Sequence, residues 1–277
     1  MENNLVRKGY KAYNKGLICR GMQFVEGQEF ETIGSPKACS SGIHYCENPL
    51  DVLDYYDLIG SEFTEVEAIG DIHTDDNKKF ATNKIKIGIK LDLPAFIEAS
   101  IDFVWEKIKS DSGKDEKVQA ASGDFSQLAA SEHFSKLAAS GQSSKLAASG
   151  DYSKLAASGD NSKLAASGHS SQLAASGHSS KLAASGDFSK LAASGQSSKL
   201  AASGDYSKLE LTGKDSVGAA IGYDNKIKAI KGCWIALAEY DNNGIILCVK
   251  SAKVDGKKIK ADTWYRLENK KFTETEV

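Results

Sequence analysis

Between residues 122 and 209 the hydrophobic and polar positions repeat every nine residues, in the pattern Ser-Gly-x-x-Ser-(Lys/Gln)-Leu-Ala-Ala. In a helix this period would advance about two and a half turns, so successive leucines would fall on opposite faces, and each glycine would cost about 1 kcal/mol. A strand instead sends serine, leucine and the second alanine to one face, and lysine or glutamine with the first alanine to the other. The pattern therefore predicts a parallel β-solenoid in which each leucine stacks on its counterpart in the next coil.

The corners and the size of each coil follow from the remaining positions. The Ser-Gly-x-x segment is expected to form the corner, with glycine supplying backbone freedom. Either two or three repeats per coil would align the variable corner positions into ordered columns. The volume of the interior favours two repeats per coil. Three repeats would form a triangle with nine-residue sides, and one leucine, one alanine and one serine per side could not fill its interior. We therefore predict 18 residues per coil and about six coils, at about 4.8 Å each, over residues 111–227.

The segments on either side of the repeat show other patterns. Residues 1–110 alternate short β-rich runs with turn signals, include a predicted hairpin of residues 62–72 and 84–91, and end in an amphipathic helix over Pro94–Lys109. Residues 228–277 contain two predicted strands, Trp234–Tyr240 and Ile245–Val249, around an Asn-Gly turn, then two further strands, Lys250–Val254 and Thr263–Leu267. We expect a mainly β protein, in which an N-terminal α+β module with its helix and a C-terminal β-meander cap the open strand edges of the solenoid.

Composition and charge restrict the classes of molecule that the protein can bind. The chain has 277 residues and a formal net charge of −2, with acids and bases interspersed, so no field of one sign would hold a polyanion or a membrane surface. Direct nucleic-acid binding is therefore disfavoured. The longest apolar stretch, Gly244–Val249, is too short to cross a bilayer, and the N-terminus lacks the apolar core of a signal peptide. We expect a cytoplasmic protein whose five scattered cysteines are reduced.

Chemically reactive residue types gather in the segment Gly42–Pro49, which holds His44 and Cys46, with Cys39 nearby. The spacing suits neither a zinc site nor a Cys/His nucleophile, because no second pair of ligands and no third partner follows. The Asp and His residues of the repeat corners also lack the glycine-rich pattern of calcium-binding nonapeptides, and we interpret them as solvated corners. We therefore predict no metal, no cofactor and no catalytic residue.

The segment around His44 resembles the strand-helix step of ADP-ribosyltransferase folds, and Cys19-Arg20-Gly21 resembles the early Arg/His-Gly strand of that family. No Ser-Thr-Ser strand or catalytic glutamate motif follows, and Glu65 and Glu67 are the candidates for the missing carboxylate. The resemblance implies an alternative function, in which the N-terminal module is an enzyme acting on NAD and the solenoid is a spacer.

Longer stretches resemble a second family. The runs Cys19–Phe24, Ser41–Val52, Lys253–Gly256 and Asp262–Leu267 are similar to a family of unknown function encoded by phages, prophages and gut bacteria, whose members carry Ser-Gly-Asp-Tyr-Ser-like nonapeptides between the same two ends. That resemblance implies a phage context and brings no activity. Small non-enzymatic phage proteins frequently counter host defences, so an inhibitor such as an anti-CRISPR is one implied role.

The leading hypothesis is a non-enzymatic protein-binding or scaffold protein, whose solenoid presents a ladder surface to a protein partner or spaces its end modules. A virion component is a further alternative, and formation of a homo-oligomer is left open. Pairing alternate repeats collects aromatic residues on a single edge of the solenoid. We predict that these residues and the lysines that follow them bind the partner: Phe134, Tyr152, Phe188 and Tyr206, with Lys136, Lys154, Lys190 and Lys208.

Overall fold

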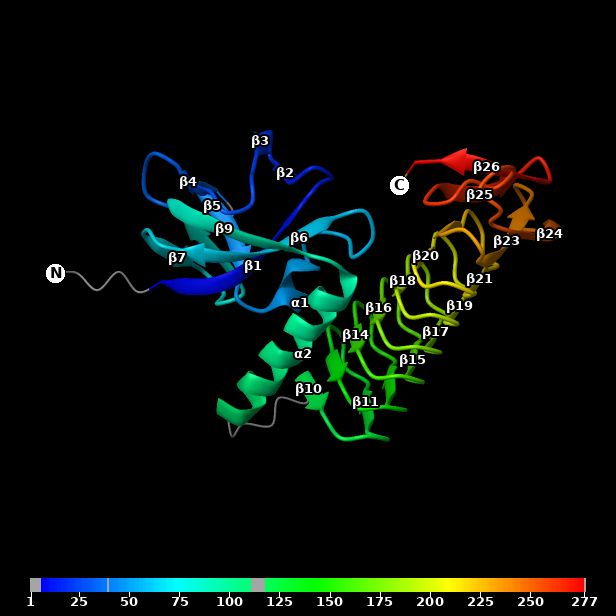
Figure 1. Ribbon diagram of the computed structural model, residues 1–277, viewed down its shortest axis with the longest axis horizontal. Helices are drawn as coiled ribbons and strands as arrows, with labels where there is room; N and C mark the ends of the chain where they lie inside the picture. The colour runs from blue at the N-terminus through cyan, green and yellow to red at the C-terminus, as the bar shows by residue number, and fades with distance from the viewer. Residues whose placement is uncertain (1–5, 39, 111–117, 277) are drawn as a thin grey trace. The chain divides into compact units, whose positions relative to one another are not determined.

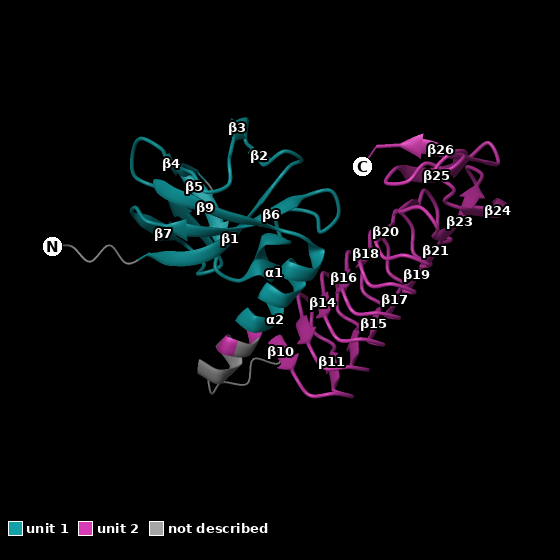
Figure 2. Ribbon diagram, viewed as in Figure 1, with its two compact units in different colours: residues 1–103 teal, residues 104–277 magenta. Residues whose placement is uncertain are grey.

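The computed structural model describes residues 6–38, 40–110 and 118–276. The chain divides into two compact units, residues 1–103 (unit 1) and 104–277 (unit 2), which Figure 2 shows in different colours. Each unit has its own sheets and its own hydrophobic core. Among the helices of the described ranges, none is long and apolar enough to cross a membrane.

Unit 1 is built on one antiparallel sheet of seven strands. In sheet order these are β4 (Glu29–Glu31), β9 (Lys84–Leu91), β6 (Glu62–Ala68), β1 (Arg7–Tyr13), β5 (Ile43–Cys46), β8 (Lys79–Thr82) and β7 (Ile72–Thr74) (Figure 1). A small hairpin of β2 (Ile18–Cys19) and β3 (Met22–Gln23) follows β1. The antiparallel module is confirmed. The two segments predicted as a hairpin do pair, as β6 and β9, but β7 and β8 lie between them in the chain, so the hairpin connection is wrong.

The helices are α1 (Pro49–Val52) and α2 (Leu93–Ser110). α1 begins at Pro49 because the side chain of Asn48 accepts the N–H of Leu50 at 3.0 Å and proline has no N–H to satisfy. Along α2, Phe96 and Ile97 are buried, and the ring of Phe96 packs on Phe63 of β6 with centroids 4.3 Å apart. The amphipathic stripe therefore forms the expected helix and contributes to the core of unit 1. Its role as a cap of the solenoid stays a prediction.

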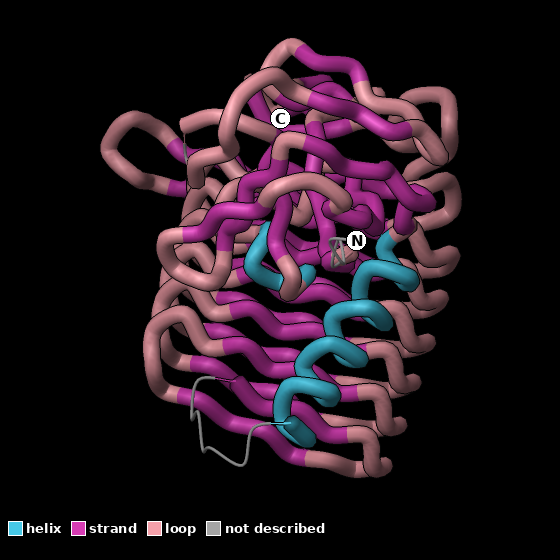
Figure 3. The backbone as a smooth tube through the Cα atoms, turned by 90° about the vertical axis from the view of Figure 1, so that its left-hand side faces the viewer, coloured by secondary structure: helices cyan, strands magenta, loops and turns pink. Residues whose placement is uncertain are grey.

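Unit 2 contains a β-solenoid of about seven parallel coils, each with two short strands (Figure 3). The strands form two sheets, which we call the even sheet and the odd sheet after their strand numbers. The register pairs residues 18 apart, as Leu137 with Leu155 in the even sheet and Leu146 with Leu164 in the odd sheet. Two nonapeptides per coil are therefore confirmed.

The even sheet contains β10 (Val118–Ala121), β12 (Lys136–Ala139), β14 (Lys154–Ala157), β16 (Gln172–Ala175), β18 (Lys190–Ala193), β20 (Lys208–Leu211) and β22 (Lys226–Ala229). The odd sheet contains β11 (Gln127–Ala130), β13 (Lys145–Ala148), β15 (Lys163–Ala166), β17 (Lys181–Ala184), β19 (Lys199–Ala202), β21 (Val217–Ala220) and β23 (Trp234–Tyr240).

The interior of the solenoid follows the alternation in the repeat. Leucine, the second alanine and the serine before lysine are buried, as in Leu155, Ala157 and Ser153. The hydroxyl of this serine donates to the carbonyl three residues earlier, as Ser144 Oγ does to the Gly141 oxygen at 2.8 Å. From Ser135 to Ser198 the serine at this repeat position therefore keeps a hydrogen bond, and the narrow space between the sheets is filled by small and medium side chains.

The corner glycines serve a different purpose from the expected one. None of the described glycines between 123 and 222 has a positive φ; the left-handed residue is the second variable position, such as Tyr152 with φ of 57°. A Cβ on Gly141 would instead collide with the backbone carbonyl of Gly123, one coil earlier. The repeat therefore requires glycine because successive corners stack too closely for a side chain, and the expectation of backbone freedom is wrong.

At the C-terminal end both sheets continue into antiparallel strands. In the odd sheet, β23 pairs with β24 (Ile246–Lys253). In the even sheet, β22 pairs with β25 (Trp264–Glu268), which pairs with β26 (Lys271–Thr275). The hairpin of β23 and β24 and the strand β25 confirm three of the predicted strands, but Lys250–Val254 continues β24 instead of forming a separate strand, and β26 was not predicted. The last parallel strand of each sheet gains an antiparallel neighbour that covers its edge.

Candidate functional site

Four aromatic side chains lie on the corner that leads from the odd sheet to the even sheet, and we call them the aromatic row: Phe134, Tyr152, Phe188 and Tyr206. Their placement on one edge is confirmed by the 18-residue coil. The rings of Phe134 and Tyr152 stack with centroids 5.0 Å apart, and those of Phe188 and Tyr206 with centroids 5.1 Å apart. All four are exposed, by between 43% and 53%. The row therefore offers a partner two stacked apolar pairs, separated by the coil in which Ser170 occupies the same position.

Two further rings extend the pair of Phe188 and Tyr206. Tyr223 lies 5.5 Å from Tyr206, and Tyr240 of β23 lies 6.3 Å from Tyr223, measured between ring centroids. The predicted set of aromatic residues includes neither Tyr223 nor Tyr240. The repeat is degenerate in this region, and Tyr223 occupies the first variable position of the corner instead of the second. An alignment of corners in steps of 18 residues would have found Tyr223.

The Asp and His side chains of the corners hold successive coils together. Asp151 Oδ1 accepts the N–H of His169 at 2.8 Å, and Asp205 Oδ1 accepts the N–H of Tyr223 at 2.7 Å. His133 Nδ1 accepts the N–H of Asp151 at 3.1 Å. The interpretation as merely solvated corners was incomplete, because these side chains satisfy backbone donors of the next coil.

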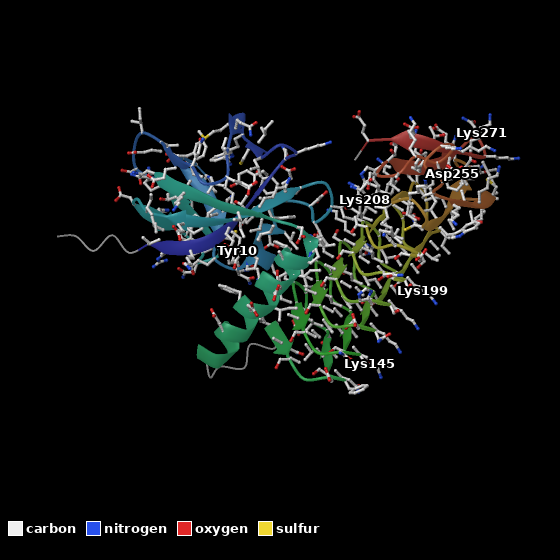
Figure 4. The ribbon with its side chains drawn as sticks, in the orientation of Figure 1. Tyr10, Lys145, Lys199, Lys208, Asp255 and Lys271 are labelled. Atoms are coloured by element: carbon white, nitrogen blue, oxygen red, sulfur yellow. The ribbon has the colours of Figure 1, made fainter. Side chains whose placement is uncertain are left out.

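The lysines predicted to accompany the aromatic row begin strands of the even sheet. Lys136 and Lys154 are buried, whereas Lys190 and Lys208 are half-buried. The odd sheet carries an equivalent set that the prediction did not include, and we call it the lysine row: Lys145, Lys163, Lys181 and Lys199. All four side chains of the lysine row are exposed. Figure 4 shows Lys145 and Lys199 projecting from the same side of the solenoid.

An apolar groove of about 780 Å³ runs beside the lysine row, along the outer face of the odd sheet. Its floor is the first alanine of successive strands, and one of its sides is the serine that begins each following corner. We call it the alanine groove, lined mainly by Ala129, Ala147, Ala165, Ala183, Ala201 and Ala219 with Ser131, Ser149, Ser167, Ser185 and Ser203. The lysine row and the alanine groove therefore form one surface, bordered by the corner that carries the aromatic row.

The reactive residues of unit 1 separate into different pockets. Arg20 and His44 line one pocket, whereas Glu65 and Glu67 line another. The arrangement therefore does not bring the candidate carboxylates of a transferase together with Arg20 and His44. Over the described residues, no group of three or more His, Cys, Asp or Glu side chains could hold a metal ion, and Cys39 lies outside those residues.

Comparison with known proteins adds one finding. Residues 7–99, which lie within unit 1, match a family model described as a domain of unknown function, DUF7666. No curated protein matches the chain. No solved structure matches it either. Unit 1 is therefore similar to a family without an assigned activity.

Proposed function

We propose that this is a protein-binding protein, whose solenoid holds an acidic amphipathic helix of its partner in the alanine groove. The observation that carries the proposal is the position of four exposed lysines, one per coil, directly beside an apolar groove. A partner helix would lay its small apolar side chains on the alanines and its carboxylates against the lysine row. This is the helix-in-groove mode of recognition, with charge setting the orientation.

Spacing favours a helix over an extended peptide. Coils about 4.8 Å apart place the four lysine positions over about 14 Å. Acidic side chains on successive turns of a helix recur about every 5.4 Å and cover about 16 Å. Alternate side chains of an extended strand recur about every 6.8 Å and would cover about 20 Å. The flexible stems of lysine absorb the smaller mismatch, so four ion pairs form at once only with the helix.

The surroundings of the lysine row favour a protein over a nucleic acid. The corner on the far side of the alanine groove carries Asp151, Asp187 and Asp205, which would repel a phosphate backbone. Within each of the two stacked pairs of the aromatic row, the rings lie against one another and leave no space for a base. An inhibitor of a host defence system and a virion component would both use such a surface, and each stays a prediction.

The test uses a synthetic helical peptide with glutamates on one flank and alanines beside them, and its binding is measured by fluorescence anisotropy. The row variant carries four substitutions: Lys145→Gln, Lys163→Gln, Lys181→Gln and Lys199→Gln. A matched control removes four exposed lysines of the C-terminal strands and loops: Lys253→Gln, Lys257→Gln, Lys258→Gln and Lys271→Gln. We expect the row variant to lose about ten-fold in affinity or more, and the control to change by less than about two-fold.

A second substitution tests the groove itself. Ala165→Trp fills the alanine groove at an exposed position, so the solenoid folds and the peptide is displaced. Equal losses in the row variant and the control would show that binding follows net charge alone. Tighter binding of a single-stranded oligonucleotide than of the peptide would overturn the proposal in favour of nucleic acid.

A further inference from the structure

Unit 1 holds a cavity of about 280 Å³ whose charged lining residues are all cationic: Lys11, Arg20 and Lys79. No aspartate or glutamate is among the described residues that line it. The cations come from three parts of the fold, namely β1, the turn of the β2–β3 hairpin and β8. Cations that converge without carboxylates are the usual composition of an anion site.

Lys11 lies at the base of this cationic cluster, with its side chain almost fully buried and only 4% of the residue exposed. Its ammonium donates to the carbonyl oxygen of His44 at 3.1 Å and to Cys19 Sγ at 3.4 Å. Neither acceptor is a carboxylate, and burial lowers the pKa of Lys11. An ammonium has three N–H donors, and a bound anion would supply both a further acceptor and the missing charge.

Arg20 and Lys79 are the more accessible cations. Arg20 is exposed and sits in the hairpin turn with a left-handed φ of 50°, followed by Gly21 with φ of 76°. Positive φ at both central residues is typical of a two-residue hairpin turn, and this turn holds Arg20 at the cavity. Lys79 is half-buried, with its ammonium 4.2 Å from the ring centroid of Tyr55. Within the described residues no ion pair involves Arg20 or Lys79, so both charges remain available for a ligand.

His44 adds a polar group without a partner. Its Nε2 is buried and, within the described residues, has no hydrogen-bond partner. Burial, together with Lys79, Arg20 and Lys11, lowers the pKa of His44 to about 4, so the ring is neutral at pH 7. Because the neutral ring donates to the Lys37 backbone, Nε2 is an acceptor, and a buried acceptor without a partner is costly. A donor group of a ligand in the cavity would supply the missing hydrogen bond.

Aromatic side chains form the remaining walls. Tyr10, Tyr45, Tyr55 and Tyr56 line the cavity, and the hydroxyl of Tyr56 lies 3.0 Å from Cys19 Sγ. Tyrosine rings provide flat surfaces on which a planar ring stacks. We propose that this cavity binds a small aromatic anion, with Arg20 and Lys79 holding its phosphate or carboxylate and the tyrosines packing against its ring. This inference does not depend on the proposed function of the solenoid.

The test separates the charge of the ligand from its ring. Four probes are titrated into the full chain by calorimetry: phenyl phosphate, benzoate, benzyl alcohol, which lacks the charge, and inorganic phosphate, which lacks the ring. We expect phenyl phosphate or benzoate to bind at least ten-fold more tightly than benzyl alcohol and inorganic phosphate. The stronger of the two identifies the preferred anionic group. The same ligand should slow alkylation of Cys19 by iodoacetamide at least ten-fold, because that thiol lines the cavity.

Variants locate the binding. Arg20→Gln and Lys79→Gln should each weaken the better ligand at least five-fold, while Lys78→Gln, an exposed neighbour that does not line the cavity, should leave it unchanged. Circular dichroism confirms that each variant is folded. Absence of binding by both aromatic anions at millimolar concentration would overturn the proposal. The proposal would also be overturned if benzyl alcohol or inorganic phosphate bound as tightly as the aromatic anions. The same holds if Lys78→Gln lost as much affinity as Arg20→Gln and Lys79→Gln.

Discussion

The rings of Phe134 and Tyr152 lie parallel on successive coils, with centroids 5.0 Å apart and planes inclined by 7°. Both residues adopt a left-handed backbone, with φ of 61° and 57°. That conformation costs about 1–2 kcal/mol for most residues, and a stacked pair returns about 0.5–1.5 kcal/mol. Ser143 and Asn161 occupy the corresponding position on the opposite corner. The backbone cost is therefore common to both corners of the solenoid, and ring stacking offsets part of it only in the aromatic row.

The backbone of the aromatic row is open to a direct test. We expect Tyr152→Asn to change the free energy of unfolding of the solenoid by less than about 1 kcal/mol, because asparagine tolerates the left-handed region and offsets the lost stacking. Tyr152→Val should cost about 2 kcal/mol or more, because a β-branched residue resists that conformation. Hydrogen exchange of the β14 amides measures both, and equal effects of the two variants would contradict the argument.

The corner glycines provide a second prediction. Gly159→Ala should destabilise the solenoid by about 1–3 kcal/mol, because the new Cβ would collide with the carbonyl of Gly141. Gly123→Ala is the matched control, since the nearest atom to its Cβ would be Ser126 Oγ at 3.6 Å. It should change stability by less than about 0.5 kcal/mol. Urea denaturation followed by tryptophan fluorescence compares them, and similar costs would mean that backbone freedom, not close stacking, selects glycine.

The aspartate side chains of the corners provide a third prediction. Asp151 Oδ1 accepts the N–H of His169 at 2.8 Å. Asp151→Ala should cost about 1 kcal/mol and speed exchange of the His169 amide, whereas Asp151→Asn, which keeps an acceptor oxygen, should retain most of the protection. If Asp151→Asn were as damaging as Asp151→Ala, the charge of the carboxylate and not its hydrogen bond would be responsible.

The half-buried imidazole of His44 provides a pH prediction. Its pKa is lowered from 6.5 to about 4 in the folded chain, mainly by burial. Between these values the unfolded chain binds more protons, so the stability of unit 1 should fall as the pH falls from 6.5 towards 4, and should not depend on His44 above 6.5. Allowing for solvent at a half-buried site, the loss should be about 1–2 kcal/mol.

Proton NMR of the imidazole resonances measures this titration directly, and His44→Gln identifies the signal and should remove the acid-dependent loss of stability. A midpoint for His44 near 6.5 would contradict the burial argument. The variant also separates this effect from the titration of carboxylates elsewhere in unit 1, which it leaves in place.

Local pattern accounts for much of the solenoid. The alternation in Ser-Lys-Leu-Ala-Ala predicts which side chains point inward, and Leu155 and Ser153 are buried accordingly. The volume argument predicts 18 residues per coil, which the pairing of Leu137 with Leu155 confirms. The reason for the corner glycines was not accessible, because the distance between Gly141 and Gly123 depends on how tightly successive coils stack.

The candidate sites were less predictable. Lys145 and Lys154 share the same local sequence, Ser-Lys-Leu-Ala-Ala, yet one is exposed and the other buried. No local pattern distinguishes them, because the difference arises from the sheet that each lysine occupies. The cationic cavity is hidden for a similar reason: Lys11, Arg20 and Lys79 are far apart in the chain and meet only through sheet pairing and the turn of a hairpin.

The amino-acid sequence by itself determined the repeating strands, their inward leucines and the edge on which the aromatic row lies, because these depend on a period that neighbouring residues set. Only the tertiary structure decided that the lysine row and the alanine groove form one exposed surface, and that Arg20 and Lys79 converge with His44 on one cavity. Both depend on distances between residues on separate strands, and such distances are set by sheet register and packing.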